Sequence, residues 1–144
     1  MATDRNAEVV WHGSLMDGEG TIVSTSTGAI GEQPVSWAGR SGEAATLTSP
    51  EELIAAAHAS CFAMALSHGL AQAGHPPEEL RTSATVTFQP GEGITRIALA
   101  VRGRVPGIDA AAFDEAAEAA KAGCPVSQAL AGVPEISLDA SLQG

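Results

Sequence analysis

The sequence predicts an α+β fold in which one long central helix is wrapped by antiparallel β-sheet. An apolar, alanine-rich segment begins at Ser49 and ends before Gly74, and its apolar side chains occur on all sides of the helix rather than on one stripe. Shorter segments with strand-like alternation lie before and after it, separated by glycine and proline. We therefore expect other elements to cover this helix on most of its sides.

The first part of the chain carries strand signals. Segments rich in β-branched residues and tryptophan are separated by glycine and proline, as in a small meander, at residues 9–11, 21–27 and 35–37. Residues 38–48 are small and polar and show no periodicity, so we expect a loop there. This loop contains Arg40.

A capping signal marks the start of the long helix. Ser49 can act as the N-cap, Pro50 suits the first helical position, and Glu52 completes a capping box three residues after the serine. The helix is expected to run to about Ala73, because Gly74 and the prolines that follow it end a helix.

The rest of the chain predicts two strands, two helices and a last strand, at residues 84–88, 96–102, 109–121, 125–131 and 136–139. A Gln-Pro-Gly-Glu-Gly hairpin connection joins the two strands. Asp109 is the expected N-cap of the longer helix. Cys124 is the expected N-cap of the shorter one, because Pro125 suits a first helical position.

Length and charge restrict the classes of protein. The 144 residues fit a single domain over residues 1–144. Seventeen acidic residues against seven basic ones give a formal net charge of -10, so neither nucleic acid nor an anionic membrane is an expected partner. The N-terminus lacks signal-peptide features, and the apolar run 53–66 is shorter than the roughly 20 residues that span a bilayer. We expect a cytoplasmic protein.

The two cysteines, Cys61 and Cys124, allow several interpretations. Each can be a small buried residue without a chemical role. They can form a redox pair, which requires the fold to bring them together, since the reducing cytosol disfavours permanent disulfides. They can also bind zinc with His58 and His68, which share a helical face with Cys61. The residue pattern leaves these alternatives open.

Charged groups near the long helix bear on the acidity of the thiols. Glu52 has a capping role, which leaves Glu51 without one, and Arg40 is the nearest permanent positive charge. A guanidinium group beside a thiolate lowers the pKa of the cysteine, and a carboxylate fixes the guanidinium in place. Arg40 can equally be a solvated loop charge. On local electrostatics alone, Cys124 at a helix N-terminus would be the more acidic thiol.

Two motifs stand out in the chain: SPEELIAAAHASCF, which follows a loop arginine, and VPGIDAAAFDEAAEAAKAGCPVSQAL. Together they resemble the OsmC/Ohr family of peroxidases, named for osmotic induction and organic hydroperoxide resistance. The resemblance covers essentially the whole chain, and the PGID and GCPVSQ segments are similar to the OsmC branch. It implies an OsmC-like fold, an intertwined homodimer with active sites at the subunit interface, and a peroxidase with no metal, haem or other cofactor.

The resemblance also implies residue roles. Cys61 matches the peroxidatic cysteine and Cys124 the resolving one, while Arg40 matches the activating arginine and Glu51 its carboxylate partner. An organic hydroperoxide, and also hydrogen peroxide, would be reduced in defence against oxidative or osmotic stress. An external dithiol would reopen the Cys61–Cys124 disulfide.

Apolar residues around Cys61 favour an organic substrate: Ile54, Phe62, Met64 and Leu66. With the resemblance, the zinc interpretation falls, and His58 and His68 become core or pocket-wall residues, with His58 one helical turn from Cys61. The alternative function is that of a dimer which binds apolar ligands without peroxidase activity.

Overall fold

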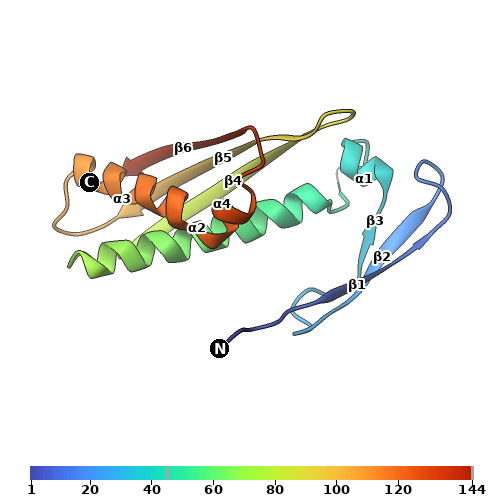
Figure 1. Ribbon diagram of the computed structural model, residues 1–144, viewed down its shortest axis with the longest axis horizontal. Helices are drawn as coiled ribbons and strands as arrows, with labels where there is room; N and C mark the ends of the chain where they lie inside the picture. Colours follow the sequence, from blue (N-terminus) through green and yellow to red (C-terminus); the bar gives the residue numbers. More distant parts are fainter. Residues whose placement is uncertain (45, 144) are drawn as a thin grey trace. The chain divides into compact units, whose positions relative to one another are not determined.

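The computed structural model describes residues 1–44 and 46–143 (Figure 1), so position 45 of the predicted loop and the last residue of the predicted domain lie outside the description. The chain forms two compact units, an N-terminal unit (Met1–Leu53) and a C-terminal unit (Ile54–Gly144). Whether residues 1–144 act as one domain stays a prediction.

The N-terminal unit contains the predicted meander. Its antiparallel sheet has the order β1-β2-β3, and its strands are β1 (Ala7–His12), β2 (Glu19–Thr25) and β3 (Gln33–Val35). The strands lie close together at Gly20, where an added Cβ atom would lie 2.5 Å from the Trp11 ring. A side chain at this position would therefore collide with the indole.

The loop expected over residues 38–48 begins with a short helix, α1 (Trp37–Ser41), which the sequence analysis did not predict. Ser36 caps this helix, and its hydroxyl accepts the N–H of Gly39 at 3.1 Å. A helix of five residues is too short to show a periodic pattern, so only the serine cap signalled it. Arg40 therefore comes from a helix rather than from a loop.

The long helix α2 (Pro50–Gln72) has the predicted bounds. The Ser49 hydroxyl accepts the N–H of Glu52 at 3.1 Å, which confirms the N-cap. The other half of the capping box differs, because the Glu52 carboxylate accepts the Thr48 hydroxyl at 2.7 Å. Gly74 adopts φ 88°, a left-handed conformation that favours glycine and ends the helix.

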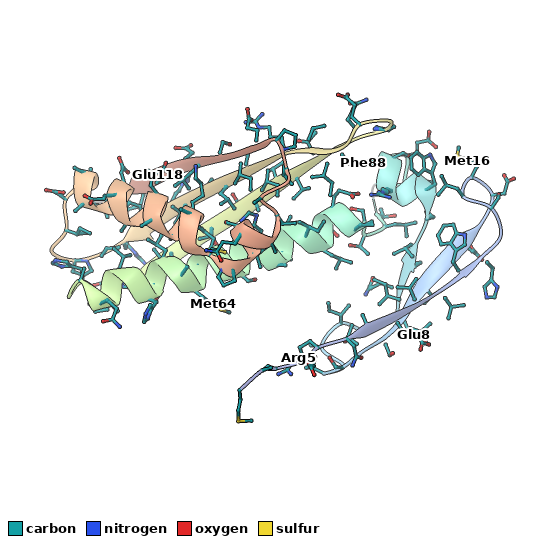
Figure 2. All side chains as sticks on the ribbon, in the orientation of Figure 1. Arg5, Glu8, Met16, Met64, Phe88 and Glu118 are labelled. Carbon is teal, nitrogen blue, oxygen red and sulfur yellow. The ribbon has the colours of Figure 1, made fainter. Side chains whose placement is uncertain are left out.

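Within the C-terminal unit, α2 buries one row of side chains spaced four residues apart: His58, Phe62, Leu66 and Leu70. On another side, Met64 is 72% exposed and points away from the sheet of this unit (Figure 2). Within the C-terminal unit taken by itself, α2 is therefore covered on one side and not on most sides. Its apolar side chains are enough for a second covering surface, which this chain's C-terminal unit does not supply.

The apolar length of α2 also exceeds the predicted run 53–66. Among the residues that the structure describes, α2 is the one helix long and apolar enough to cross a membrane by length and composition. The core helix of a soluble protein passes the same test, so this property by itself does not indicate a membrane protein.

The sheet of the C-terminal unit has the order β4-β5-β6, with β4 (Glu79–Gln89), β5 (Gly93–Arg104) and β6 (Glu135–Leu142). β4 and β5 form the predicted hairpin and are longer than expected, whereas β5 and β6 pair in parallel. The sheet is thus not wholly antiparallel. α3 (Ala110–Gly123) and α4 (Pro125–Ala129) connect β5 to β6, and such a crossover makes the two strands parallel.

α2 and α3 lie along the same face of this sheet and enclose the core (Figure 1). Asp109 is the N-cap of α3, as predicted, and its carboxylate accepts the N–H of Ala112 at 2.8 Å. Phe113 of α3 is fully buried, and its ring packs on Gly103 of β5. A Cβ atom added to Gly103 would lie 2.6 Å from this ring. Glycine at position 103 therefore leaves room for the aromatic side chain.

We expect Phe113→Ala to lower the free energy of unfolding by about 3–5 kcal/mol, because it leaves a cavity between α3 and β5. Urea denaturation measures the change. Phe113→Leu, which keeps most of the volume, should cost clearly less. A loss below about 1 kcal/mol for Phe113→Ala would contradict the packing described here.

Candidate active site

The fold brings the two cysteines together in the C-terminal unit. Cys61 is a partly exposed residue of α2, and Cys124 is wholly buried where α3 ends and α4 begins. Both are free thiols, and their side chains hydrogen-bond each other. Two thiols that lie near each other can form a disulfide after oxidation of one of them.

The backbone holds Cys124 in this position. Its N–H donates to the carbonyl of Ala120 at 2.9 Å as the C-cap of α3, and the same residue is the N-cap of α4 with Pro125 in the first turn. The Cys124 side chain makes no capping hydrogen bond to α4, but the backbone N–H groups at the start of this helix act on the thiol pair. The Val126 N–H favours the thiolate of both cysteines, and the Ser127 N–H favours that of Cys124.

These contacts separate the acidity of the two thiols. Burial raises the pKa of Cys61, and the hydrogen bond with Cys124 raises it further. The Val126 N–H lowers this pKa, but its effect is smaller than the two others together. Burial alone would also raise the pKa of Cys124. However, hydrogen bonds from Cys61, from the N–H and hydroxyl of Ser127 and from the Val126 N–H outweigh burial, so the pKa of Cys124 is lowered. Within this unit, Cys124 is the more acidic thiol.

A second cluster lies in the N-terminal unit. Arg40 of α1 donates from Nε to Oε1 of Glu51 at 3.2 Å and from Nη2 to Oε2 at 3.0 Å. Glu51 is 6% exposed, whereas Glu52 is exposed and takes part in capping. This bidentate geometry fixes the plane of the guanidinium group.

An apolar pocket of about 140 Å³ adjoins Arg40 in the same unit. Its other lining residues, which the sequence analysis did not single out, are Trp11, Leu15, Val35, Ser36, Trp37 and Pro50. The exposure that marks these large apolar side chains is visible only in the structure, where Trp11 is 38% and Leu15 56% exposed. The pocket places an apolar cavity beside a fixed positive charge.

The apolar lining that the sequence predicted around Cys61 is only partly present. Phe62 and Leu66 have no exposed surface and belong to the core, because they lie on the buried row of α2. Met64 is exposed and Ile54 is half-buried. Phe62 and Leu66 therefore cannot contact a substrate, and that part of the prediction is wrong.

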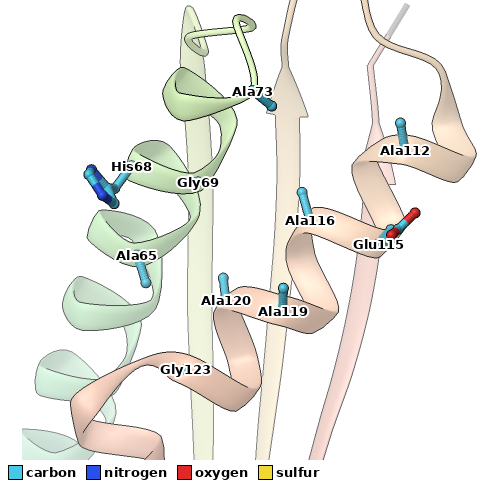
Figure 3. A pocket seen from close by; sticks show the side chains of 10 residues that line it. All are labelled: Ala65, His68, Gly69, Ala73, Ala112, Glu115, Ala116, Ala119, Ala120 and Gly123. Carbon is cyan, nitrogen blue, oxygen red and sulfur yellow. The ribbon is translucent and has the colours of Figure 1, made fainter.

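A groove of about 500 Å³ lies between α2 and α3 (Figure 3). Small residues such as Ala65, Gly69 and Ala116 line it together with His68, and neither cysteine belongs to it. His58, in contrast, is wholly buried and hydrogen-bonds Ser127. Within residues 1–44 and 46–143, no three or more His, Cys, Asp or Glu residues are grouped to hold a metal ion, so the zinc interpretation has no ligand set there.

Comparison with known proteins identifies the family of this chain. Residues 42–139 match the family described as OsmC-like protein. The chain belongs to the OsmC family. It is 46% identical to the peroxiredoxin OsmC of Escherichia coli, with 99% of each chain covered. The family resemblance read from the sequence is thereby confirmed.

Solved structures show the same OsmC fold. A putative organic hydroperoxide resistance protein from Vibrio cholerae is 25% identical, with a TM-score of 0.70 and coverage of 100% of this chain and 95% of that chain. The organic hydroperoxide resistance protein OhrB of Bacillus subtilis is 24% identical, with a TM-score of 0.62 and coverage of 96% and 98%. The expected α+β, OsmC-like fold class is confirmed.

Proposed function

We propose that this OsmC family protein is a two-cysteine peroxidase that reduces organic hydroperoxides, and also hydrogen peroxide, in defence against oxidative or osmotic stress. The observation that carries the proposal is that the fold places the two free cysteines, Cys61 and Cys124, near enough for their side chains to interact. The chemistry needs no cofactor, since a thiolate is itself the nucleophile. Residues 1–144 act as one peroxidase domain.

In the first step, the Cys61 thiolate attacks one oxygen of the hydroperoxide. The S–O bond forms as the O–O bond breaks, leaving Cys61 as a sulfenic acid, and the alkoxide takes up a proton to become the alcohol. Arg40 stabilises the thiolate and the developing negative charge on the alkoxide. Glu51 holds the guanidinium in orientation through two hydrogen bonds.

In the second step, the Cys124 thiolate attacks the sulfur of the Cys61 sulfenic acid. The S–S bond forms, the S–O bond breaks, and the hydroxide leaves as water with the proton that the Cys124 thiol gave up. An external dithiol then supplies two electrons and reopens the disulfide. Rapid disulfide formation protects Cys61 from further oxidation to the sulfinic and sulfonic acids.

The acidity of the thiols suits this order of events. The hydrogen bonds from Ser127 and Val126, which favour the Cys124 thiolate, do not depend on the Cys61 thiol and remain when the sulfenic acid appears. Cys61, whose pKa is raised chiefly by burial, needs an activating positive charge before it can attack the peroxide. Arg40 is the group we assign to this task.

The substrate class follows from the surroundings of Arg40. Its apolar pocket of about 140 Å³ includes Trp11, Leu15 and Trp37, which favour the alkyl or aryl group of an organic hydroperoxide over a water-like peroxide. The same guanidinium can orient the polar O–O–H group, because its N–H groups are hydrogen-bond donors.

The assembly we propose is an intertwined homodimer in the cytoplasm. The apolar side of α2 that carries Met64 is not covered by the C-terminal unit, and a second copy of the chain would cover it. The formal net charge of -10 disfavours nucleic acid and anionic lipid as partners. A cytosolic location supplies the dithiol reductant that the cycle requires.

Thiol counting with Cys124→Ser tests the function. After reduction, one equivalent of cumene hydroperoxide per chain should remove both thiols of the wild type and yield one equivalent of alcohol, with thiols counted in denaturant. Cys124→Ser should lose its one thiol, and excess peroxide should add further oxygen atoms to Cys61, visible by intact mass. Two surviving wild-type thiols would instead favour a dimer that binds apolar ligands.

A further inference from the structure

His58 is a buried titratable group for which the proposed cycle has no use. It lies one turn before Cys61 on α2 and has no exposed surface. Its Nε2 atom is 2.7 Å from Oγ of Ser127, a buried residue of α4. The Ser127 hydroxyl also hydrogen-bonds Cys124. A continuous line of contacts therefore runs from the imidazole through a hydroxyl to the resolving thiol.

The hydroxyl fixes the direction of these hydrogen bonds. Ser127 has one hydroxyl hydrogen, and when the Cys124 thiol is ionised, the hydroxyl donates this hydrogen in a hydrogen bond to the sulfur. The oxygen must then accept the hydrogen on Nε2 of His58, which leaves Nδ1 without a hydrogen. Accordingly, Nδ1 of His58 is a buried atom without a hydrogen-bond partner in the part of the chain described. Burial lowers the pKa of His58, which favours the neutral ring that this arrangement requires.

We propose that His58 is a positioning residue for disulfide formation: its Nε2–H holds the Ser127 hydroxyl so that the hydroxyl hydrogen points at the Cys124 sulfur. The inference rests on the proposed function. A serine hydroxyl in a helix otherwise turns to donate to a carbonyl of the preceding turn. Because the Nε2–H of His58 donates to the Ser127 oxygen, the Ser127 hydroxyl hydrogen is directed to the Cys124 sulfur.

The consequence concerns only the second step of the cycle. The Cys124 thiolate attacks the sulfenic sulfur of Cys61, the S–S bond forms and the S–O bond breaks. The hydroxide leaves as water with the proton released by Cys124. Neither His58 nor Ser127 gains or loses a proton overall. Their contribution is to keep Cys124 ionised and correctly oriented at the moment of attack.

One test measures Cys124 without any peroxide. In a Cys61→Ser background, thiolate absorbance is followed as a function of pH, so that Cys124 and His58 are the titratable groups left in this line of contacts. Ser127→Ala and His58→Leu should each raise the Cys124 pKa by about one unit, as expected for the loss of one hydrogen bond to a charged group.

A second test follows the reaction. After one equivalent of cumene hydroperoxide, the rate of disulfide formation relative to that of the first oxidation should fall about tenfold in Ser127→Ala and in His58→Leu. His58→Gln, which keeps a side-chain N–H, should restore the ratio to within about threefold of the wild type. His68→Gln is the matched control on the same helix, because His68 is exposed. Its ratio should equal that of the wild type.

The double variant decides whether His58 acts through Ser127. If it does, His58→Leu with Ser127→Ala forms the disulfide no more slowly than Ser127→Ala alone. The inference would be overturned if the double variant slowed disulfide formation by the product of the two single effects, or if Ser127→Ala left the Cys124 pKa unchanged. Should His58→Leu fail to fold, Ser127→Ala and His58→Gln still decide it. A wild type that loses no thiols would refute the peroxidase, whereas the titration would still test the role of His58.

Discussion

Cys61→Ser should abolish hydroperoxide reduction, with a loss of at least about 10³-fold in the rate of peroxide consumption, as for removal of other catalytic nucleophiles. A serine hydroxyl is not ionised near neutral pH and is not oxidised to a sulfenic acid by a hydroperoxide. Consumption of cumene hydroperoxide with an excess of dithiol measures the effect. Cys124→Ser is the matched control, because it removes the other thiol and keeps the proposed nucleophile.

The control also tests the order of the two cysteines. Cys124 is the more acidic thiol in the C-terminal unit, so the reverse order has a physical basis. If Cys61→Ser still loses its remaining thiol to one equivalent of hydroperoxide while Cys124→Ser keeps its own, Cys124 attacks first and the assigned roles are exchanged.

Arg40→Ala is expected to slow the first oxidation by about 10²–10³-fold, the usual cost of removing one group that stabilises charge in a transition state. It also leaves the buried carboxylate of Glu51 without its bidentate partner. Arg40→Lys should recover only part of the rate, since a lysine keeps the charge but lacks the planar fork. The second-order rate constant for thiol loss measures both variants.

The pH profile of alkylation separates activation from folding. In a Cys124→Ser background, Arg40→Ala should shift the alkylation of Cys61 to higher pH, because the thiolate loses a stabilising cation. Arg96→Ala is the control, since Arg96 forms an exposed ion pair with Glu135 at 2.7 Å. An unchanged profile in Arg40→Ala would exclude Arg40 as the activator of Cys61.

Local sequence signals predicted most of the elements. Ser49 and Asp109 cap their helices as expected, and Gly74 ends α2, because caps depend on neighbouring residues alone. The helix α1 was missed because five residues show no period. The parallel pairing of β5 and β6 was also missed, since strand alternation does not specify a partner's direction.

In the candidate site, too, local sequence signals predicted some residues, whereas others depend on the tertiary fold. The predicted capping role of Glu52 left Glu51 available, and the structure pairs Glu51 with Arg40 eleven positions earlier. In contrast, no local pattern could show that the thiols of Cys61 and Cys124 lie near each other, since only the tertiary fold brings α2 to the start of α4. Ser127 was missed for the same reason, because its partner His58 lies 69 residues away in the sequence.

The position of Cys124 between two helices also bears on how the oxidised enzyme is recycled. Cys124 is wholly buried, whereas Cys61 keeps some exposed surface, so we expect an incoming dithiol to attack the Cys61 sulfur of the disulfide. Cys124 would then be the leaving group, and hydrogen bonds from Ser127 and Val126 favour its thiolate. The hydrogen bonds proposed to prepare Cys124 for closing the disulfide would thus also favour its release, and we expect the mixed disulfide with the reductant to form on α2.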